Sequence, residues 1–550
     1  MEQLPDEVIL DESNVLSGEI RRIGKKRCIG SEYFSSMKKN KHRVAQYIFD
    51  TGETDTYEEL LQRCVRTALH LQQRNLNPDD VVCLSSYNHR DSCVPFIAST
   101  FLGLKVASLD PSFTSTDAAY LLKMVKPKIM FIVPEIIGII SRALEEAALE
   151  TELVIYGDDV DKSIHTAFTD FLEHHQDEEA FTPVEIDDIC ETAVIFFSSG
   201  TTGLPKGICV NHKALYSQGC LIHRYGLLHK DSVFLSFPTL YWISTVFHMT
   251  SIIIVGCARL IVKKIDADQI WYQIDKYKVT YAFLAPFHAY QMIAVGRPDN
   301  IDTSSLSVVI TGGAIFYADK IFELRELLPG TFICQAFGLT EVGGVALAFN
   351  IVRTRDRLLL YNNPSSCGRP MPGFLYKVVN LENERTCRAN EKGELRIYSE
   401  FLLNGYYRQD SSEVFDGDGW LCTGDIVYYD EDACFYIVGR IKEMLKYQSW
   451  HVPPAVLEDV IQEHPAVKQV VVVGIPHQTD GEHPLALVVL KDQYKNTDPS
   501  RDIEHFVAKR VNDTHKLRGG VKFVESFPLT PSGKIKRAYM KEMVLNGEIQ

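Results

Sequence analysis

A run of glycine, hydroxyl and lysine residues at positions 198–207 is the segment of the chain best suited to hold phosphate. It reads SSGTTGLPKG and follows the apolar segment TAVIFF. Backbone amides in a glycine-rich turn can converge on phosphate oxygens because no Cβ atom blocks the approach. Four hydroxyl side chains add hydrogen-bond donors, and Lys206 adds a positive charge. The composition therefore predicts a phosphate-binding loop that follows a buried strand.

Two alternatives compete with this interpretation. A P-loop requires a Gly-Lys pair followed by Ser or Thr, whereas here Pro205 precedes Lys206 and Gly207 follows it. An ordinary Gly/Ser surface turn would be favoured for a loop with only two or three of these features. A run of ten such residues after an apolar strand favours phosphate binding outside the P-loop class.

The elements that must position this loop alternate between helical patterns and short apolar runs. Residues 57–74 have helical spacing, and apolar segments follow at 81–87, 128–133, 151–157, 192–197 and 306–313. Helices alternating with β-branched runs are typical of α/β layers with largely parallel sheets. We therefore expect an α/β fold whose large N-terminal domain contains parallel sheets.

The pattern changes twice towards the C-terminus. After about Gly368 short strands and turns predominate, which indicates a smaller β-rich unit within the large domain. After Gly439 the chain reads as a compact α/β module of the size that folds independently. We predict an N-terminal domain at residues 40–438 and a small, mobile C-terminal domain at residues 439–550, joined by a short hinge.

Composition narrows the class of protein. A chain of 550 residues is long enough for more than one domain, and a net charge of −15 disfavours nucleic acid or an anionic membrane as the main partner. The 13 cysteines include no Cys-x-x-Cys pair, and no signal peptide or membrane-spanning segment is evident. We expect a cytoplasmic protein. The last three residues are not a peroxisomal signal of the Ser-Lys-Leu type. A peroxisomal location stays possible because of the family resemblance described next.

Seven segments in order along the chain resemble the adenylate-forming superfamily, in the branch of acyl-CoA synthetases, coumarate-CoA ligases and firefly luciferase. They are the loop at 198–207, TGGA at 311–314, QAFGLTE at 335–341, GWLCTGDI at 419–426, GRIKEMLKY at 439–447 and the closing LRGG and PLTPSGKIKR segments at 517–520 and 528–537. The resemblance covers nearly the whole chain from about residue 40 and implies an enzyme that activates a carboxylic acid with ATP.

The resemblance also implies a set of nucleotide-binding residues. They are Ser198, Ser199, Gly200, Thr201, Thr202, Gly203, Lys206, Gly312, Gly313, Ala314, Gln335, Ala336, Phe337, Gly338, Thr340, Asp425, Arg440 and Lys534. Asp425 is expected to accept hydrogen bonds from the ribose hydroxyls, with Arg440 supporting it. Phe337 replaces the family's usual tyrosine, so any hydrogen bond made by that hydroxyl is lost.

Three residues are implied in catalysis and one in metal binding. Lys206 would hold the outer phosphates, Thr340 would reach the α-phosphate, and Glu341 would ligate Mg²⁺. Lys534 would bridge the acyl carboxylate and the α-phosphate, a role that suits the compact charge of an ammonium group. Each alone has an ordinary alternative: Thr-Glu is usually a helix start, and Pro-Ser-Gly-Lys a solvated turn.

The second half-reaction is expected to follow rotation of the small domain about residues 439–442, which opens a path for the thiol of CoA. After the hinge the chain departs from the family pattern, with Gln448, Ser449 and Trp450 in place of Lys-Gly-aromatic. Adenylation is therefore better supported than the identity of the acceptor. The wall of the acid pocket is expected in FPTLYWIST at 237–245 and at residues 342–344, where plain core packing is the alternative for Tyr241 and Trp242.

The sequence thus predicts an ATP-dependent acid–thiol ligase, an AMP-forming acyl-CoA synthetase, acting on a fatty or aromatic carboxylic acid. ATP, Mg²⁺ and CoA are its expected cofactors, the acid its small-molecule partner. A luciferase-type monooxygenase, which adenylates its substrate and then oxidises it, is the alternative. A nucleotide-binding protein without activity is the third reading, and the intact charged residues argue against it.

Overall fold

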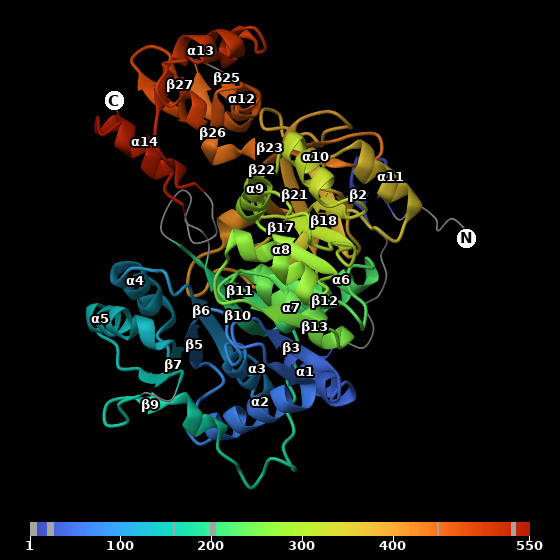
Figure 1. The fold of residues 1–550 in the computed structure, drawn as a ribbon, viewed down its shortest axis with the longest axis vertical. Coiled ribbons are helices and arrows are strands. Elements are labelled where there is room, and N and C mark those ends of the chain that lie inside the picture. Colours follow the sequence, from blue (N-terminus) through green and yellow to red (C-terminus); the bar gives the residue numbers. More distant parts are fainter. Residues whose placement is uncertain are drawn as a thin grey trace.

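In this computed structural model of the chain, the described residues are 8–18, 27–157, 160–197, 205–447, 450–529 and 535–549. Their strands form five sheets, and helices pack against the sheets (Figure 1). The predicted fold class, α/β with parallel sheets, a β-rich unit and a smaller C-terminal α/β module, is confirmed.

The first sheet has the strand order β11-β10-β6-β5-β7-β8-β9. Its strands are β5 (Val81–Ser85), β6 (Lys105–Leu109), β7 (Ile129–Ile132), β8 (Glu152–Ile155), β9 (Thr166–Ala167), β10 (Thr192–Phe197) and β11 (Gly207–Asn211). All neighbours are parallel except the antiparallel pair β10–β11. Strand β5 is buried along its length, as is usual for a parallel strand with both faces covered. The segment predicted to bind phosphate connects β10 to β11.

The second sheet has the order β16-β15-β14-β12-β13-β3-β4. Its strands are β3 (Val44–Ile48), β4 (Thr54–Thr56), β12 (Val233–Ser236), β13 (Ala258–Ile261), β14 (Tyr281–Leu284), β15 (Val308–Thr311) and β16 (Phe332–Gln335). Only β3 and β4 are antiparallel. The carboxyl ends of β12, β14, β15 and β16 therefore meet at one edge, which is where open α/β sheets bind ligands.

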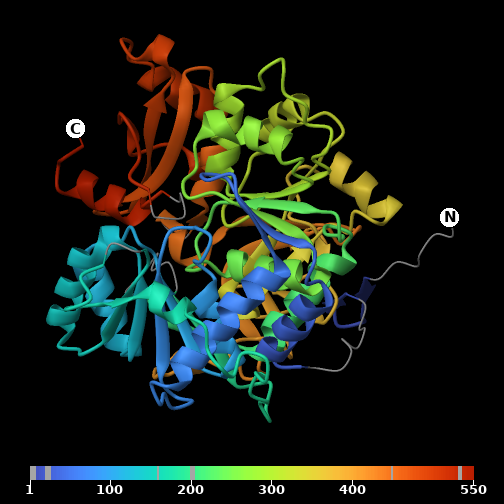
Figure 2. The ribbon, with the colours of Figure 1, turned by 60° about the horizontal axis from the view of Figure 1, so that its bottom comes forward.

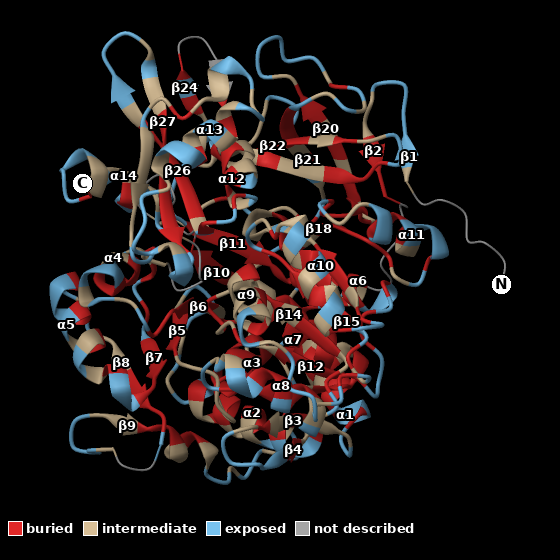
Figure 3. Ribbon diagram, turned by 45° about the horizontal axis from the view of Figure 1, so that its top comes forward, coloured by how far each residue is buried: buried red, intermediate tan, exposed pale blue. Residues whose placement is uncertain are grey.

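Helices accompany these two sheets, and several of them, such as α5, have an exposed side and a buried side (Figure 3). They are α1 (Ile29–Lys39), α2 (Tyr57–Gln72), α3 (Val94–Phe101), α4 (Ser115–Val125), α5 (Ile137–Ala147), α6 (His212–Arg224), α7 (Ile243–Val255), α8 (Ala267–Lys276), α9 (Pro286–Val295), α10 (Ala318–Leu327) and α11 (Thr354–Asn362). Helix α2 begins with a capping box between Thr56 and Glu59, which satisfies amides that would otherwise lack partners. No helix in the described ranges is long and apolar enough to cross a membrane.

Two antiparallel sheets make up the β-rich unit. The smaller contains β17 (Phe337–Leu339), β18 (Gly344–Ala348) and β19 (Arg369–Pro370); the larger contains β1 (Ile9–Leu10), β2 (Leu16–Ser17), β20 (Phe374–Val379), β21 (Gly393–Ser399), β22 (Leu421–Tyr429) and β23 (Phe435–Arg440). Short strands and turns therefore follow Gly368, as expected from the sequence. Strands β1 and β2 were not expected from the sequence, because strands of two residues carry no hydrophobic period and Leu16 pairs with the distant Tyr376.

The C-terminal module has its own sheet and its own apolar core. Its elements are β24 (Leu445–Tyr447), β25 (Trp450–Val452), α12 (Pro454–Gln462), β26 (Val467–His477), β27 (Gly481–Leu490), α13 (Ser500–Ala508), β28 (Gly520–Phe523) and α14 (Arg537–Leu545). The long hairpin β26–β27 buries apolar side chains on both faces, one face under α12 and α13 and the other under α14. In Figure 2 the orange and red module stands beside the rest of the chain.

Candidate active site

A cleft lies between the second sheet, the β-rich unit and the C-terminal module. Its walls are the segments that follow β12, β15 and β16, the strands β22 and β23, and the helices α12 and α14 on the opposite side. Figure 1 shows the C-terminal module beside β22, β23 and α10. The carboxyl ends of parallel strands thus open onto a space that three parts of the chain share, which is the usual place for a ligand in this fold class.

The turn at residues 312–314, predicted to bind the nucleotide, joins β15 to the wall of the cleft. Gly312, Gly313 and Ala314 line the cleft, and Gly313 has φ of +87°, a conformation that suits glycine. A Cβ atom on Gly312 would lie 3.4 Å from the carbonyl oxygen of Ala336. The turn therefore runs close to the segment after β16, as expected from the parallel pairing of β15 and β16.

Gln335 fixes this arrangement through both ends of its side chain. Its Oε1 accepts a hydrogen bond from the backbone N–H of Phe316 at 3.0 Å, and its Nε2 donates to the Pro364 carbonyl at 3.1 Å. Phe337 and Gly338 follow and also line the cleft. A Cβ atom on Gly338 would lie 2.2 Å from the carbonyl oxygen of Gly344, so this glycine permits the close pairing of β17 with β18.

Asp425 and Arg440, predicted separately from the sequence, form one ion pair. They lie opposite each other on β22 and β23. Arg440 Nε donates to Asp425 Oδ1 at 2.7 Å, and Nη2 donates to Oδ2 at 3.2 Å. The Asp425 side chain is 6% exposed, that of Arg440 38%. Burial opposes the charge of Arg440, but the carboxylate outweighs this and raises the pKa of the guanidinium. The pair holds a carboxylate in a defined orientation at the cleft.

Lys206, Thr340 and Glu341 lie on one wall of the cleft. Lys206 Nζ lies 4.4 Å from the centre of the Tyr406 ring, a cation–π contact. Burial, followed by the nearby negative charge of Glu341, raises the pKa of Tyr406 to about 12. The Glu341 backbone carbonyl accepts a hydrogen bond from the Leu403 amide at 2.8 Å. The wall thus combines a cation, a carboxylate and a threonine hydroxyl.

Tyr406 is the residue of this wall that the sequence analysis missed. It lies in the connection between β21 and β22, in the run NGYYRQD, which carries no recognisable pattern. It reaches the wall because an isolated bridge pairs it with Ile208 of β11. This long-range pairing, together with the backbone hydrogen bond from the Tyr407 amide to the Gly207 carbonyl at 2.7 Å, brings the ring under the lysine.

The segment after β12 forms the part of the cleft expected to hold the acid. Tyr241 and Trp242 line the cleft and pack edge to face, with ring centres 4.8 Å apart. Tyr241 is 6% exposed and also packs against Phe113, so the two readings of this residue, pocket wall and core packing, both apply. Gly344 also lines the cleft. Val342, expected there as well, is fully buried in the hydrophobic core instead.

Several predicted residues fall outside the described ranges. They are Ser198, Ser199, Gly200, Thr201, Thr202, Gly203 and Lys534, together with Gln448 and Ser449 after the hinge. Their predicted roles stay predictions.

Comparison with known proteins points to one family. The family model described as AMP-binding enzyme matches residues 34–407, and the model described as AMP-binding enzyme C-terminal domain matches residues 456–534. The 4-coumarate–CoA ligase 2 of Petroselinum crispum is 29% identical over 520 residues, which cover 91% of each chain. The luciferin 4-monooxygenase of Photinus pyralis is 28% identical over 508 residues, which cover 90% of each chain.

Solved structures agree with these matches. The luciferase-like enzyme from the nonluminescent mealworm Zophobas morio is 36% identical with a TM-score of 0.74, covering 78% of this chain and 99% of that one. ATP-bound MatB from Rhodopseudomonas palustris has the same fold, with a TM-score of 0.82 at 21% identity over 94% of this chain and 98% of that one. Since the first family model alone matches more than half of the chain, the protein belongs to the AMP-binding enzyme family, within the adenylate-forming superfamily that its motifs resemble.

Proposed function

We propose that this protein is an ATP-dependent acid–thiol ligase that converts a fatty or aromatic carboxylic acid into its CoA thioester by way of an acyl-adenylate. One observation carries the proposal. The glycine turn at residues 312–314, the Asp425–Arg440 pair and the wall of Lys206, Thr340 and Glu341 line a single cleft, although they are far apart in sequence.

The described residues fit a bound adenine nucleotide. The turn at residues 312–314 and the Phe337 ring can pack against the base. The two glycines of the turn have no side chain, so the base can approach the backbone closely. Asp425 is oriented by Arg440 and can accept hydrogen bonds from two ribose hydroxyls. Lys206 and the loop at 198–203 would bind the outer phosphates.

In the first step a carboxylate oxygen of the acid attacks the α-phosphorus of ATP. The bond from the α-phosphorus to the oxygen of the β-phosphate breaks, and pyrophosphate leaves. Negative charge concentrates in this transition state, so fixed cations and donors supply most of the acceleration. We assign Lys206 to the leaving phosphates, Thr340 to the α-phosphate and Lys534 to the bridge between acid and α-phosphate.

Glu341 is the residue that would bind Mg²⁺. Its carboxylate lies on the wall that carries Lys206, and Mg²⁺ in nucleotide sites is usually held by one or two carboxylates together with phosphate oxygens and water. The ion would neutralise charge on the phosphates during adenylation.

In the second step the thiolate of CoA attacks the acyl carbon, and AMP leaves. We propose that the domains span residues 40–438 and 439–550 and that the second rotates about residues 439–442 between the steps. The separate apolar cores of the C-terminal module support this division. A rotation of this kind would withdraw α12 and α14, which close one side of the cleft, and admit the thiol.

The residues that line the part of the cleft expected to hold the acid favour an apolar substrate. That part of the cleft is lined by Tyr241, Trp242, Phe247 and Gly344. A Cβ atom on Gly344 would meet Gln218 and Phe247 at 3.0 Å, so this glycine lets the wall pack closely. We therefore favour medium- or long-chain fatty acids and aromatic acids over short, charged ones.

The test measures pyrophosphate release from ATP and Mg²⁺ with a panel of carboxylic acids, with and without CoA, and thioester formation by mass spectrometry. We expect acid-dependent pyrophosphate release, and acyl-CoA when CoA is present. Lys206→Ala serves as the low-activity control. Failure of every acid to release pyrophosphate would contradict the proposal.

Similarity to luciferin 4-monooxygenases gives the second candidate function, adenylation followed by oxidation. The wall of Tyr241 and Trp242 argues against it, because two large rings occupy space that an oxidised product and oxygen would need, and neither ring can transfer protons as histidine does. We expect little or no light with ATP, Mg²⁺ and luciferin. Strong luminescence without any thioester would favour the monooxygenase instead.

A further inference from the structure

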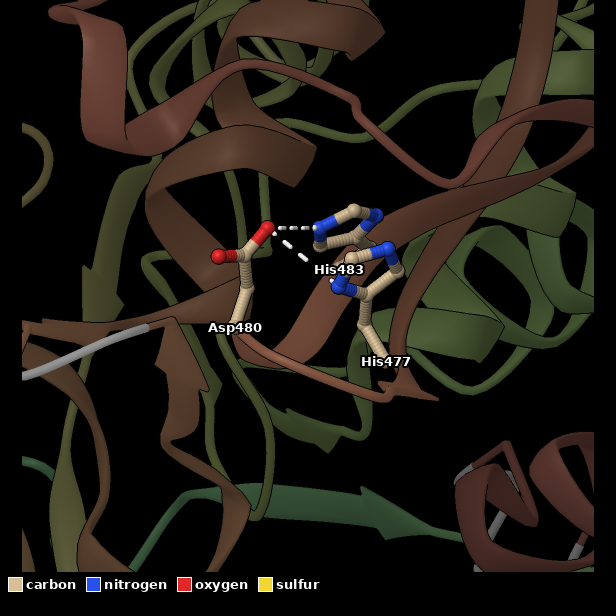
Figure 4. Close-up of side chains that lie close together, drawn as sticks. All are labelled: His477, Asp480 and His483. Carbon is tan, nitrogen blue, oxygen red and sulfur yellow. Dashed lines mark hydrogen bonds and ion pairs between the residues drawn. The ribbon is translucent and has the colours of Figure 1, made fainter.

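Two histidines and an aspartate converge at the tip of the β26–β27 hairpin, away from the residues assigned to the reaction. His477 ends β26, Asp480 lies in the turn, and His483 lies in β27. Asp480 Oδ2 lies 3.3 Å from His477 Nδ1 and 2.9 Å from His483 Nε2. One ligand atom from each residue lies within 4.8 Å of the others. Figure 4 shows both imidazoles facing the same carboxylate oxygen.

The hairpin holds these side chains in place. His477 pairs with Gly481 and His483 pairs with Ile475, so the two histidines are diagonal neighbours on one face of the ladder. Their rings stack with centres 3.8 Å apart and planes inclined by 15°. The paired strands thus fix the separation of two of the three ligands.

Gly481 fixes the turn that carries the third ligand. It has φ of +82°, and a Cβ atom there would lie 2.5 Å from the Lys446 carbonyl oxygen. The glycine lets the hairpin pack directly against β24, where Tyr447 pairs with Gly481. The backbone pairing of Gly481 therefore places Asp480 next to β27, beside the two histidines.

The spacing of the three atoms suits a metal ion. Zinc binds imidazole nitrogen and carboxylate oxygen at about 2.0–2.2 Å, so adjacent ligands in a tetrahedron lie about 3.3–3.5 Å apart. The Asp480 carboxylate oxygen lies 3.3 and 2.9 Å from the two imidazole nitrogens, which is close to this ligand-to-ligand separation. Because the two rings are stacked with nearly parallel planes, one imidazole would rotate so that both nitrogens face the same ion.

The ligand types select a class of metal. Imidazole nitrogen suits zinc, copper and nickel, whereas Mg²⁺ and Ca²⁺ prefer oxygen ligands. We propose that His477, Asp480 and His483 bind a divalent transition-metal ion of the zinc class, with water completing the coordination. The side chains are 42%, 23% and 17% exposed respectively, which leaves a path for the ion and for the water.

The proposed site is independent of the proposed ligase reaction. None of its three residues lines the cleft, although the neighbouring Gly481 and Glu482 do. Glu482 is engaged by Lys541 at 2.6 Å and by the Lys446 amide at 3.0 Å, so it is not counted among the ligands. Binding of the ion would stiffen a hairpin that packs against β24, the first strand after the hinge.

The experiment measures Zn²⁺ binding to the untagged full-length protein, without nucleotide, by isothermal titration calorimetry and by metal analysis after dialysis. His477→Ala, Asp480→Asn and His483→Ala are compared with His505→Ala, an exposed histidine of the same module outside the group. We expect the wild type and His505→Ala to bind one more Zn²⁺ ion than the three variants, or to bind it at least about tenfold more tightly, since even outer partners of metal ligands change affinity by about ten- to a hundredfold.

Two further measurements keep the outcome clear. Co²⁺ in place of Zn²⁺ should give visible absorption bands in the wild type that the His477→Ala, Asp480→Asn double variant lacks, while circular dichroism confirms that the variant is folded. An excess of Mg²⁺ should not displace the ion. Equal binding of Zn²⁺ by wild type and all three variants, or no binding by the wild type, would overturn the proposal.

Discussion

Replacing Asp425 with asparagine separates the charge of this carboxylate from its shape. The side chain keeps its size and one acceptor oxygen. It loses its negative charge and the second of the two oxygens that accept hydrogen bonds from Arg440, at 2.7 and 3.2 Å. If Asp425 also binds the ribose hydroxyls, the substitution weakens its hydrogen bonds to Arg440 and to the ribose. We expect a higher Kd and KM for ATP, and a smaller change in kcat.

The magnitude follows from the environment of the carboxylate. Asp425 is 6% exposed, so water screens it little. A hydrogen bond to a charged acceptor in such a setting contributes about 1.5–3 kcal/mol, which corresponds to about a 10- to 150-fold change in affinity. Asparagine retains part of the interaction, so we expect the loss of ATP affinity in Asp425→Asn to lie at the low end of this range. We expect the loss in Asp425→Ala to lie at the high end.

The assay is calorimetric binding of ATP, with steady-state pyrophosphate release as a second reading. The matched control is Glu391→Gln, because Arg385 also binds Glu391 through two hydrogen bonds, at 2.8 and 2.9 Å, at an exposed site that does not line the cleft. Loss of an exposed pair of this kind has little effect on stability, because water screens it, and should leave ATP binding unchanged.

Unchanged ATP affinity in Asp425→Asn and Asp425→Ala, with both proteins folded, would refute the assignment. The pair with Arg440 would then serve only to join β22 to β23. An equal loss of affinity in Glu391→Gln would refute it too, since the effect would then come from net charge and not from the cleft.

Three other predictions concern adenylation and stability. Lys534→Ala should lower pyrophosphate release by about two orders of magnitude but largely spare thioester formation from supplied acyl-adenylate; equal loss of both steps would contradict its assignment to the first. Glu341→Gln should raise the Mg²⁺ concentration needed for half-maximal rate, with ATP held in excess, and an unchanged Mg²⁺ dependence would exclude it as a ligand. Burial lowers the pKa of His248 to about 3 and of His212 to about 4. The unfolded chain therefore takes up protons below pH of about 6.5 that the folded chain does not, and each histidine removes about 1.4 kcal/mol of stability per pH unit on acidification. We measure the urea concentration at the unfolding midpoint at pH 7.5, 6.5 and 5.5. It should decrease once the pH drops below about 6.5, and it should decrease less in His248→Gln. A midpoint that does not change with pH would contradict this prediction.

Strand positions were predictable where both faces of a strand are covered. The segment at 192–197 became β10 with the same bounds, because an apolar run bounded by polar turns leaves little choice of register. Strands β1 and β2 were not predictable, since they exist only through pairing with β20.

The sequence by itself determined the family, the α/β class and the identity of the residues with chemical potential, because short ordered segments such as CTGDI and FGLTE carry that information locally. Only the tertiary structure decided which of them meet. The register of β22 against β23 places Asp425 opposite Arg440, and the bridge from Tyr406 to Ile208 brings an unpredicted ring under Lys206. The hairpin register likewise brings His477 to His483. The first two contacts depend on pairing between separate strands, which no single segment of the sequence encodes, and the third depends on the register that the turn imposes on its hairpin.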